Sequence, residues 1–193
     1  MRIVSGTLKG RRFSPPAGFK ARPTTDFAKE NLFNVLNNQI SFDEIKVLDL
    51  FAGTGSISFE FASRGCSDIT SVEMNFKHHL FITKTAEELN LKRVMKVIKA
   101  DAFRFVEKVT GQFDLIFADP PFDLEKAADL PQMIADCNLL SEDGFFILEH
   151  SDKKDYRHHP LFIEVRAYGK VNFSFFGRVA KIGISSNQGT EQK

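Results

Sequence analysis

The sequence contains no tryptophan, only two cysteines and no long apolar run. Cys66 and Cys137 lie far apart and lack the spacing of a metal site, so we expect reduced thiols rather than a disulfide framework. No segment approaches the roughly 18 consecutive apolar residues of a membrane span. The basic N-terminus lacks the apolar core of a secretory signal. A cytoplasmic protein without membrane association is therefore expected.

Histidine is also scarce, with five residues in all. His78–His79 and His158–His159 are neighbours whose side chains point different ways on a helix or strand, and no cysteine lies near them. We expect these pairs at the surface and expect no metal site.

The charge that is present is unevenly distributed. The net charge of the 193 residues is only +1, yet residues 1–30 hold seven bases and two acids. A basic segment on a mildly acidic body favours a contact with nucleic acid at one end of the protein. The alternative is a solvated, flexible N-terminus without a partner.

From residue 43 onward, short apolar runs alternate with helix-like stretches. This alternation predicts βαβ units and a mostly parallel sheet with helices on both faces, in an α/β Rossmann-like fold. Two alternating runs around Tyr168-Gly169-Lys170 predict a C-terminal antiparallel β-hairpin. Pro131 should kink or restart the helix that contains it. The expected strands are 46–52, 68–74, 94–101, 113–121 and 144–150, with the hairpin at 162–177.

Three parts of the chain are expected. Residues 1–42 form a small basic extension with a helix near residues 26–36, residues 43–184 form the main domain, and residues 185–193 form a polar, disordered tail.

The stretch "VLDLFAGTGS" places Gly53 and Gly55 between the first strand and the first helix of the sheet. A nucleotide-like ligand binds at this point in doubly wound sheets, and glycine lets the backbone approach it closely. Position 58 is serine, so the dinucleotide fingerprint is incomplete, and a P-loop ending is missing.

Acidic residues end three successive strands: Asp49, Glu73 and Asp101. An acid beside the glycines would repel a pyrophosphate and suits a ligand with a positive charge. The second acid is placed to bind ribose hydroxyls and the third to accept from an exocyclic amine. S-adenosylmethionine has all three features. The alternative is that these acids are helix caps or solvated loop residues.

The fourth strand ends in "DPPF", which is Asp119, Pro120, Pro121 and Phe122. Asp119 and the Pro120 carbonyl can accept hydrogen bonds from an exocyclic amine on a base, which holds the nitrogen in line with a methyl donor. The prolines fix the backbone, and Phe122 can stack on the base. A plain Pro-rich turn would explain the prolines but not the whole set.

These motifs together resemble the class I methyltransferases that act on amino groups. More narrowly, they resemble the bacterial 16S rRNA guanine-N2 methyltransferases of the RsmD family. The likeness extends over "MRIVSGTLKGRRF", "RPTTD…KENLFNVL", "VLDLFAGTGSISFEFASRG", "SVEMN" and "FDLIFADPPF". Two positions depart from the family pattern: Phe27, where the family often has arginine, and Ser58, where it usually has glycine.

The resemblance implies a role for each matching residue. The cofactor loop would comprise Asp49, Phe51, Gly53 and Gly55, with Glu73 at the ribose and Asp101 and Ala102 at the adenine. The catalytic tetrapeptide would be Asp119, Pro120, Pro121 and Phe122. The expected RNA contacts are Arg2, Lys9, Arg11, Arg12, Arg22 and Thr24.

The expected function is methyl transfer from S-adenosylmethionine to the N2 amine of one guanine in 16S rRNA, within a small-subunit ribosomal particle, by a monomer. A DNA adenine-N6 methyltransferase or a protein glutamine methyltransferase is the alternative among enzymes. A catalytically inactive module that binds S-adenosylmethionine is the alternative outside them.

Overall fold

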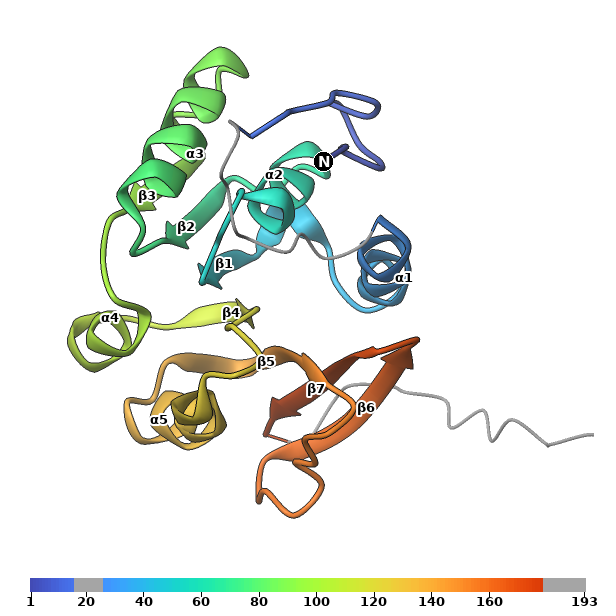
Figure 1. Cartoon of the computed structure of the whole chain (residues 1–193), viewed down its shortest axis with the longest axis vertical. Coiled ribbons are helices and arrows are strands. Elements are labelled where there is room, and N and C mark those ends of the chain that lie inside the picture. The colour runs from blue at the N-terminus through green and yellow to red at the C-terminus, as the bar shows by residue number, and fades with distance from the viewer. Residues whose placement is uncertain (16–25, 179–193) are drawn as a thin grey trace, which may run out of the picture.

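A computed structural model describes residues 1–15 and 26–178 of the chain. It contains a seven-stranded sheet in the order β3-β2-β1-β4-β5-β7-β6 (Figure 1). Every pairing from β3 through β5 is parallel, and β7 pairs antiparallel with both β5 and β6. The strands are β1 (Lys46–Leu50), β2 (Asp68–Val72), β3 (Met95–Ile98), β4 (Phe113–Ala118), β5 (Leu140–Ser151), β6 (Phe162–Tyr168) and β7 (Val171–Gly177).

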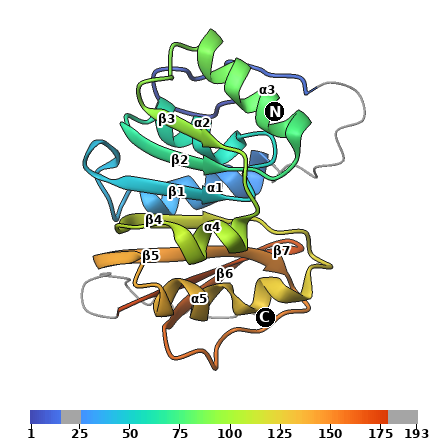
Figure 2. The same cartoon turned by 90° about the vertical axis from the view of Figure 1, so that its left-hand side faces the viewer.

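Helices cover both faces of this sheet, as Figures 1 and 2 show. One apolar cluster joins residues of α1, α2 and α3 to one face, and a second joins residues of α4 and α5 to the other. The helices are α1 (Asp26–Leu36), α2 (Ser56–Ser63), α3 (Phe76–Glu88), α4 (Ala102–Lys108) and α5 (Leu130–Asp136), with 3-10 turns η1 (Phe42–Glu44) and η2 (Glu125–Asp129). The predicted Rossmann-like fold is confirmed.

Local chemistry explains several boundaries. Asn75 caps α3 by accepting from the backbone N–H groups of Lys77 and His78. The predicted restart at Pro131 is confirmed, because η2 ends at Asp129 and α5 carries Pro131 in its first turn. The predicted hairpin is confirmed too, with Gly169 at φ 67° in its turn.

The N-terminal segment 1–15 packs on α2. Arg2 and Arg12 form an antiparallel bridge, and Ile3 is buried in the same apolar cluster as α1 and α2. The carboxylate of Glu60 accepts from the N–H groups of Val4 and Ser5 at 2.8 and 3.0 Å. Residues 1–15 are therefore a docked part of the main core rather than a free arm.

A buried ion pair secures this contact. Lys29 of α1 donates to the Arg2 carbonyl at 2.6 Å and to Ser56 Oγ at 3.0 Å. Its Nζ lies 3.8 Å from the carboxylate of Glu60, and both side chains are at most 1% exposed. Arg64 adds a second charged contact to Glu60 at 3.0 Å. Burial lowers the pKa of Lys29, and the neighbouring Glu60 opposes that shift.

The predictions for Arg22, Thr24 and the tail 185–193 concern residues outside the described part of the chain. Among the helices of the described part, none has the length and apolar character needed to cross a membrane.

Candidate active site

A cavity of about 1700 Å³ opens at the carboxyl ends of β1, β2 and β4. Small-ligand sites usually have about 300–1,000 Å³, so this cavity has room for a cofactor and a second reactant. Most of the expected site residues line it together: Asp49, Phe51, Gly53, Glu73, Asp101, Ala102, Asp119, Pro120, Pro121, Phe122 and Arg12.

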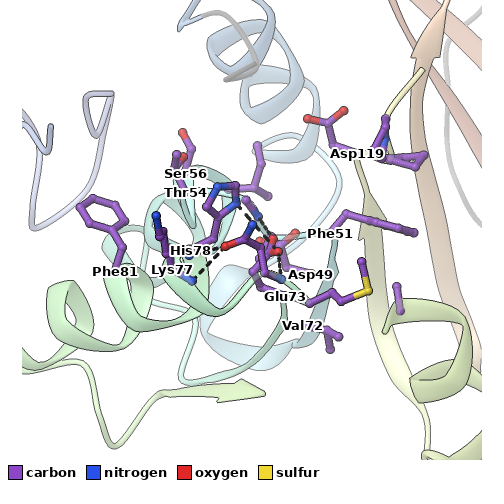
Figure 3. A pocket seen from close by; sticks show the side chains of 18 of the residues that line it. Asp49, Phe51, Thr54, Ser56, Val72, Glu73, Lys77, His78, Phe81 and Asp119 are labelled. Atoms are coloured by element: carbon purple, nitrogen blue, oxygen red, sulfur yellow. Dashed lines mark hydrogen bonds and ion pairs between the residues drawn. The ribbon is translucent and has the colours of Figure 1, made fainter. Parts of the chain in front are cut away.

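Glu73 follows β2 and anchors the glycine loop. Its Oε2 accepts from the N–H of Gly53 at 2.8 Å, and its Oε1 accepts from the N–H of Asn75 at 2.7 Å. A carboxylate has about four acceptor positions, so two remain for ligand hydroxyls. His78 Nδ1 lies 3.9 Å from this carboxylate, and Figure 3 shows the two side chains together.

The surface expectation holds for only one of the four paired histidines, because His79 and His159 are half-buried and each has a buried ring nitrogen. The side chain of His78 is only 14% exposed because α3 turns it toward Glu73 in the cavity wall. His158 is exposed as expected.

Asp49 is the most deeply buried acid of the site, with 1% exposure. Burial raises its pKa to about 7, and the nearby charge of Glu73 acts in the same direction. The hydroxyl of Ser58 donates to Asp49 Oδ2 at 2.5 Å, which favours the ionised form, and it also pairs with Ser71 Oγ at 2.7 Å. A cation in the cavity would favour the ionised form further.

Ser58 thus explains one departure from the family pattern. The position where the family usually has glycine carries a fully buried hydroxyl that connects α2 to the acid at the end of β1 and to β2. The serine gives Asp49 a hydrogen-bond donor that glycine lacks.

The two glycines of the loop serve different purposes. Gly53, at φ 57°, presents its N–H to Glu73 and lines the cavity. Gly55 does not line it; a Cβ there would lie 2.8 Å from the Phe59 ring and 3.2 Å from Ile82. Its φ of 75° and these contacts require glycine at position 55 for the packing of α2.

Phe51 also has positive φ, at 61°, which is rare for a bulky side chain. Its ring meets Phe103 edge to face, with centroids 5.7 Å apart. Such strained backbone is concentrated at functional sites.

Asp101 is a helix cap, one of the two alternatives that the sequence left open. Its Oδ1 caps α4 by accepting from the N–H of Arg104 at 3.0 Å, and the residue also lines the cavity beside Ala102.

The tetrapeptide 119–122 forms the β4 side of the cavity. Asp119 is half-buried, Pro120 is buried and Phe122 is half-buried. The carbonyl of Pro121 accepts from the N–H of Leu124 at 2.9 Å, which closes the turn. Figure 3 shows Asp119 at one side of the pocket and Phe81 at the other.

The expected RNA contacts among the described residues lie on segment 1–15, where Arg2 and Arg12 are bridge partners. Arg12 lines the cavity, whereas Lys9 and Arg11 are exposed on the extension. Arg2 forms an ion pair with Asp26 at 3.6 Å.

One lining residue, Glu149, was missed by the sequence analysis. It is 3% exposed and follows Leu148, which pairs in register with Ala118 of β4. The sequence did offer one sign of this residue: "ILEH" places an acid near the end of the fifth predicted strand, where the other strand-end acids lie.

Strand order 3-2-1-4-5-7-6 with an antiparallel β7, together with a glycine loop and strand-end acids in one cavity, defines the class I methyltransferase fold. The family model described as "Conserved hypothetical protein 95" matches residues 1–177, so the chain belongs to this family. The resemblance to the RsmD family is confirmed.

Relatives and solved structures agree with this placement. YlbH of Bacillus subtilis, named as a candidate rRNA methyltransferase, is 38% identical over 154 residues, covering 78% of this chain and 82% of the relative. The "Ribosomal RNA small subunit methyltransferase D" of Haemophilus influenzae is 31% identical over 157 residues, covering 80% of each chain.

Two structures support the fold. The yhhF protein of Escherichia coli, described as a candidate methyltransferase, superposes with a TM-score of 0.81 at 23% identity, covering 94% of this chain and 99% of the other. The SAH-bound methyltransferase PaMTH1 of Podospora anserina has a TM-score of 0.58 at 15% identity, covering 69% and 71%.

Proposed function

We propose that this protein transfers a methyl group from S-adenosylmethionine to the exocyclic N2 amine of a guanine in 16S rRNA. One observation carries the proposal. The tetrapeptide of Asp119, Pro120, Pro121 and Phe122 lines the same cavity as the acids that end β1, β2 and β3. A methyl donor and an amine acceptor would therefore meet in one cavity.

The donor side fits S-adenosylmethionine. Asp49 suits a cationic ligand, Glu73 has acceptor capacity for ribose hydroxyls, and Asp101 lies where an exocyclic amine of adenine would donate. The SAH-bound relative in fold supports the same donor. No metal is needed for this chemistry, because the sulfonium is itself an activated leaving group.

On the acceptor side, Asp119 and the Pro120 carbonyl would accept the two N–H groups of the amine. The nitrogen lone pair then attacks the methyl carbon, the carbon–sulfur bond breaks, and S-adenosylhomocysteine leaves. The charge that develops on the amine is stabilised by Asp119, and a proton passes to Asp119 or to water. Phe122 would stack on the extruded base.

The names of the relatives support RNA of the small ribosomal subunit as the substrate. Arg12 would contact phosphates at the cavity mouth, with Lys9 and Arg11 farther along the docked extension. Arg2, which forms an ion pair with Asp26, would add a further positive charge on the same segment. Arg22 and Thr24 remain predicted RNA contacts. We infer a cytoplasmic monomer that acts on a small-subunit particle.

The test uses labelled S-adenosylmethionine with small-subunit particles and free 16S rRNA from cells that lack this protein. Native protein should produce N2-methylguanine, whereas Asp119→Ala should lose most of the rate. Asp123→Ala, which removes an exposed carboxylate four residues away, is the matched control and should stay active. Label on DNA or protein instead would refute the RNA assignment, and no transfer with cofactor still bound would favour an inactive binding module.

A further inference from the structure

Four carboxylates occupy the carboxyl ends of four adjacent strands. In the order of the sheet they are Glu73 after β2, Asp49 in β1, Asp119 after β4 and Glu149 in β5. All four line the cavity. The proposed function gives a role to the first three, so Glu149 is the one whose purpose is still open.

Strand alternation places Glu149 on the face of the sheet that Phe117 and Ile147 share. Ala118 pairs with Leu148, and both belong to the apolar cluster on the α4 and α5 face. Phe117 and Ile147, one residue earlier, belong to the cluster on the opposite face, and Glu149, two residues after Ile147, returns to that face. Asp119 follows the last residue of β4 and lines the same cavity as Glu149 and Phe117.

The side chains around Glu149 form an apolar wall. Glu149 pairs in register with Phe173 of β7, whose ring centroid lies 6.3 Å from that of Phe117. Val171 and Phe117 line the cavity beside it. A planar base next to Asp119 would lie against this wall with one polar edge toward Glu149.

We propose that Glu149 accepts a hydrogen bond from N1–H of the target guanine and thereby sets the choice of base. This inference rests on the proposed function. Asp119 and Pro120 would hold the amine hydrogens, and the ring nitrogen next to the amine would face the neighbouring strand. A carboxylate has about four acceptor positions, so this bond is compatible with other contacts of Glu149.

The donor pattern of the bases explains the selectivity. Guanine has a ring N–H beside its exocyclic amine, whereas adenine and cytosine have an unprotonated ring nitrogen there. That nitrogen would place a lone pair against a buried carboxylate, which is unfavourable in a site of low polarity. Glu149 would therefore reject the two other bases that have an amine and admit guanine.

The experiment compares guanine with 2-aminopurine, which keeps the C2 amine but has no N1–H. Small-subunit particles are rebuilt with 2-aminopurine at the guanine that the labelling assay identifies. Native protein, Glu149→Gln and the control Glu142→Gln are compared for methyl transfer to both particles. Glu142 is exposed in the same strand, so its variant removes the same charge away from the cavity.

Native protein and Glu142→Gln should prefer guanine. Glu149→Gln should lower this preference by roughly 5- to 150-fold, the range expected for one base-edge contact, because the glutamine amide can accept from N1–H of guanine but can also donate to the unprotonated N1 of 2-aminopurine. Its affinity for S-adenosylmethionine should be unchanged, since Glu149 lies on the acceptor side. An equal loss on both particles would indicate a merely structural role and overturn the inference.

Two further outcomes are decisive without a stable variant. Native protein that methylates 2-aminopurine as fast as guanine would overturn the role of Glu149 while leaving the methyltransferase function intact. Native protein that transfers no methyl group to natural particles would overturn the proposed function itself, and the inference with it.

Discussion

Substituting Asp49 by asparagine should make the protein more stable at alkaline pH while it weakens cofactor binding. The pKa of Asp49 is about 7 in the folded protein against an ordinary value of 3.8, because the carboxylate is buried. Between these two values the folded state binds a proton that the unfolded state has released. Stability therefore falls as pH rises through this window.

The magnitude follows from the width of the window. Between pH 5 and pH 6 the difference is about one proton, which lowers the unfolding free energy by about 1.4 kcal/mol per pH unit, and at pH 7 it has fallen to about half a proton. Native protein should therefore lose about 2 to 3 kcal/mol of unfolding free energy from pH 5 to pH 8 through Asp49 alone. Asparagine has the same shape, stays neutral and can still bond to Ser58.

Urea unfolding at pH 5, 6, 7 and 8 measures this effect as the difference between native protein and Asp49→Asn. The other titrating groups are the same in both proteins and cancel in that difference. Asp43→Asn, which removes an exposed carboxylate, is the control and should follow the native curve. If the unfolding free energies of native protein and Asp49→Asn change in parallel with pH, the raised pKa of Asp49 is refuted.

Three other predictions follow from the same structure. The affinity for S-adenosylmethionine should rise by up to tenfold per pH unit between pH 5.5 and pH 7, because the cationic ligand favours the ionised form of Asp49. Calorimetry on Asp49→Asn should show no such dependence on pH. Gly6→Ala should lower the free energy of unfolding by about 1 to 3 kcal/mol and make the N-terminal segment sensitive to protease, because the new Cβ would lie 1.8 Å from the Ser63 carbonyl oxygen. Gly10→Ala has a similar φ but meets nothing within 4 Å, so comparable losses in both variants would contradict this account. Glu60→Gln should lower the free energy of unfolding in urea by about 3 to 5 kcal/mol, because it breaks the buried ion pair with Lys29. Glu88→Gln, which breaks the exposed ion pair with Lys84, is the control and should lower it by under about 1 kcal/mol.

Much of the fold and of the cofactor side could be predicted from local sequence. The alternation of strands and helices determines a parallel sheet, and in such sheets the ends of successive strands meet at one edge. The sequence alone therefore predicts that Asp49, Glu73 and Asp101 lie close together. The effects of Pro131 and Gly169 could be predicted as well, because they depend on the fixed φ of proline and on the conformational freedom of glycine.

Features that depend on contacts between distant segments could not be predicted. The burial of Asp49 depends on α2 and on Ser58 and Ser71, which lie on different elements. Basic residues suggested a contact with nucleic acid or a flexible N-terminus, but neither prediction included the bonds from Val4 to Glu60 and from Thr7 to Ser63, which attach this segment to α2 across 56 residues of sequence. Glu149 belongs to no motif and becomes visible only once β5 is paired with β4.

The row of four carboxylates also explains how one cavity can serve both reactants of the proposed reaction. Every group that would face the row offers hydrogen or positive charge: ribose hydroxyls at Glu73, a cation at Asp49, an amine at Asp119 and a ring N–H at Glu149. The methyl group carries positive charge from sulfur to nitrogen, so charge moves along the row from the β1 end toward β4. Carboxylates fixed by the sheet need no rearrangement as that charge moves, which is the condition for effective electrostatic stabilisation. A row of this kind would repel phosphates from the cavity interior, so the RNA backbone should stay at the mouth, where Arg12 lies.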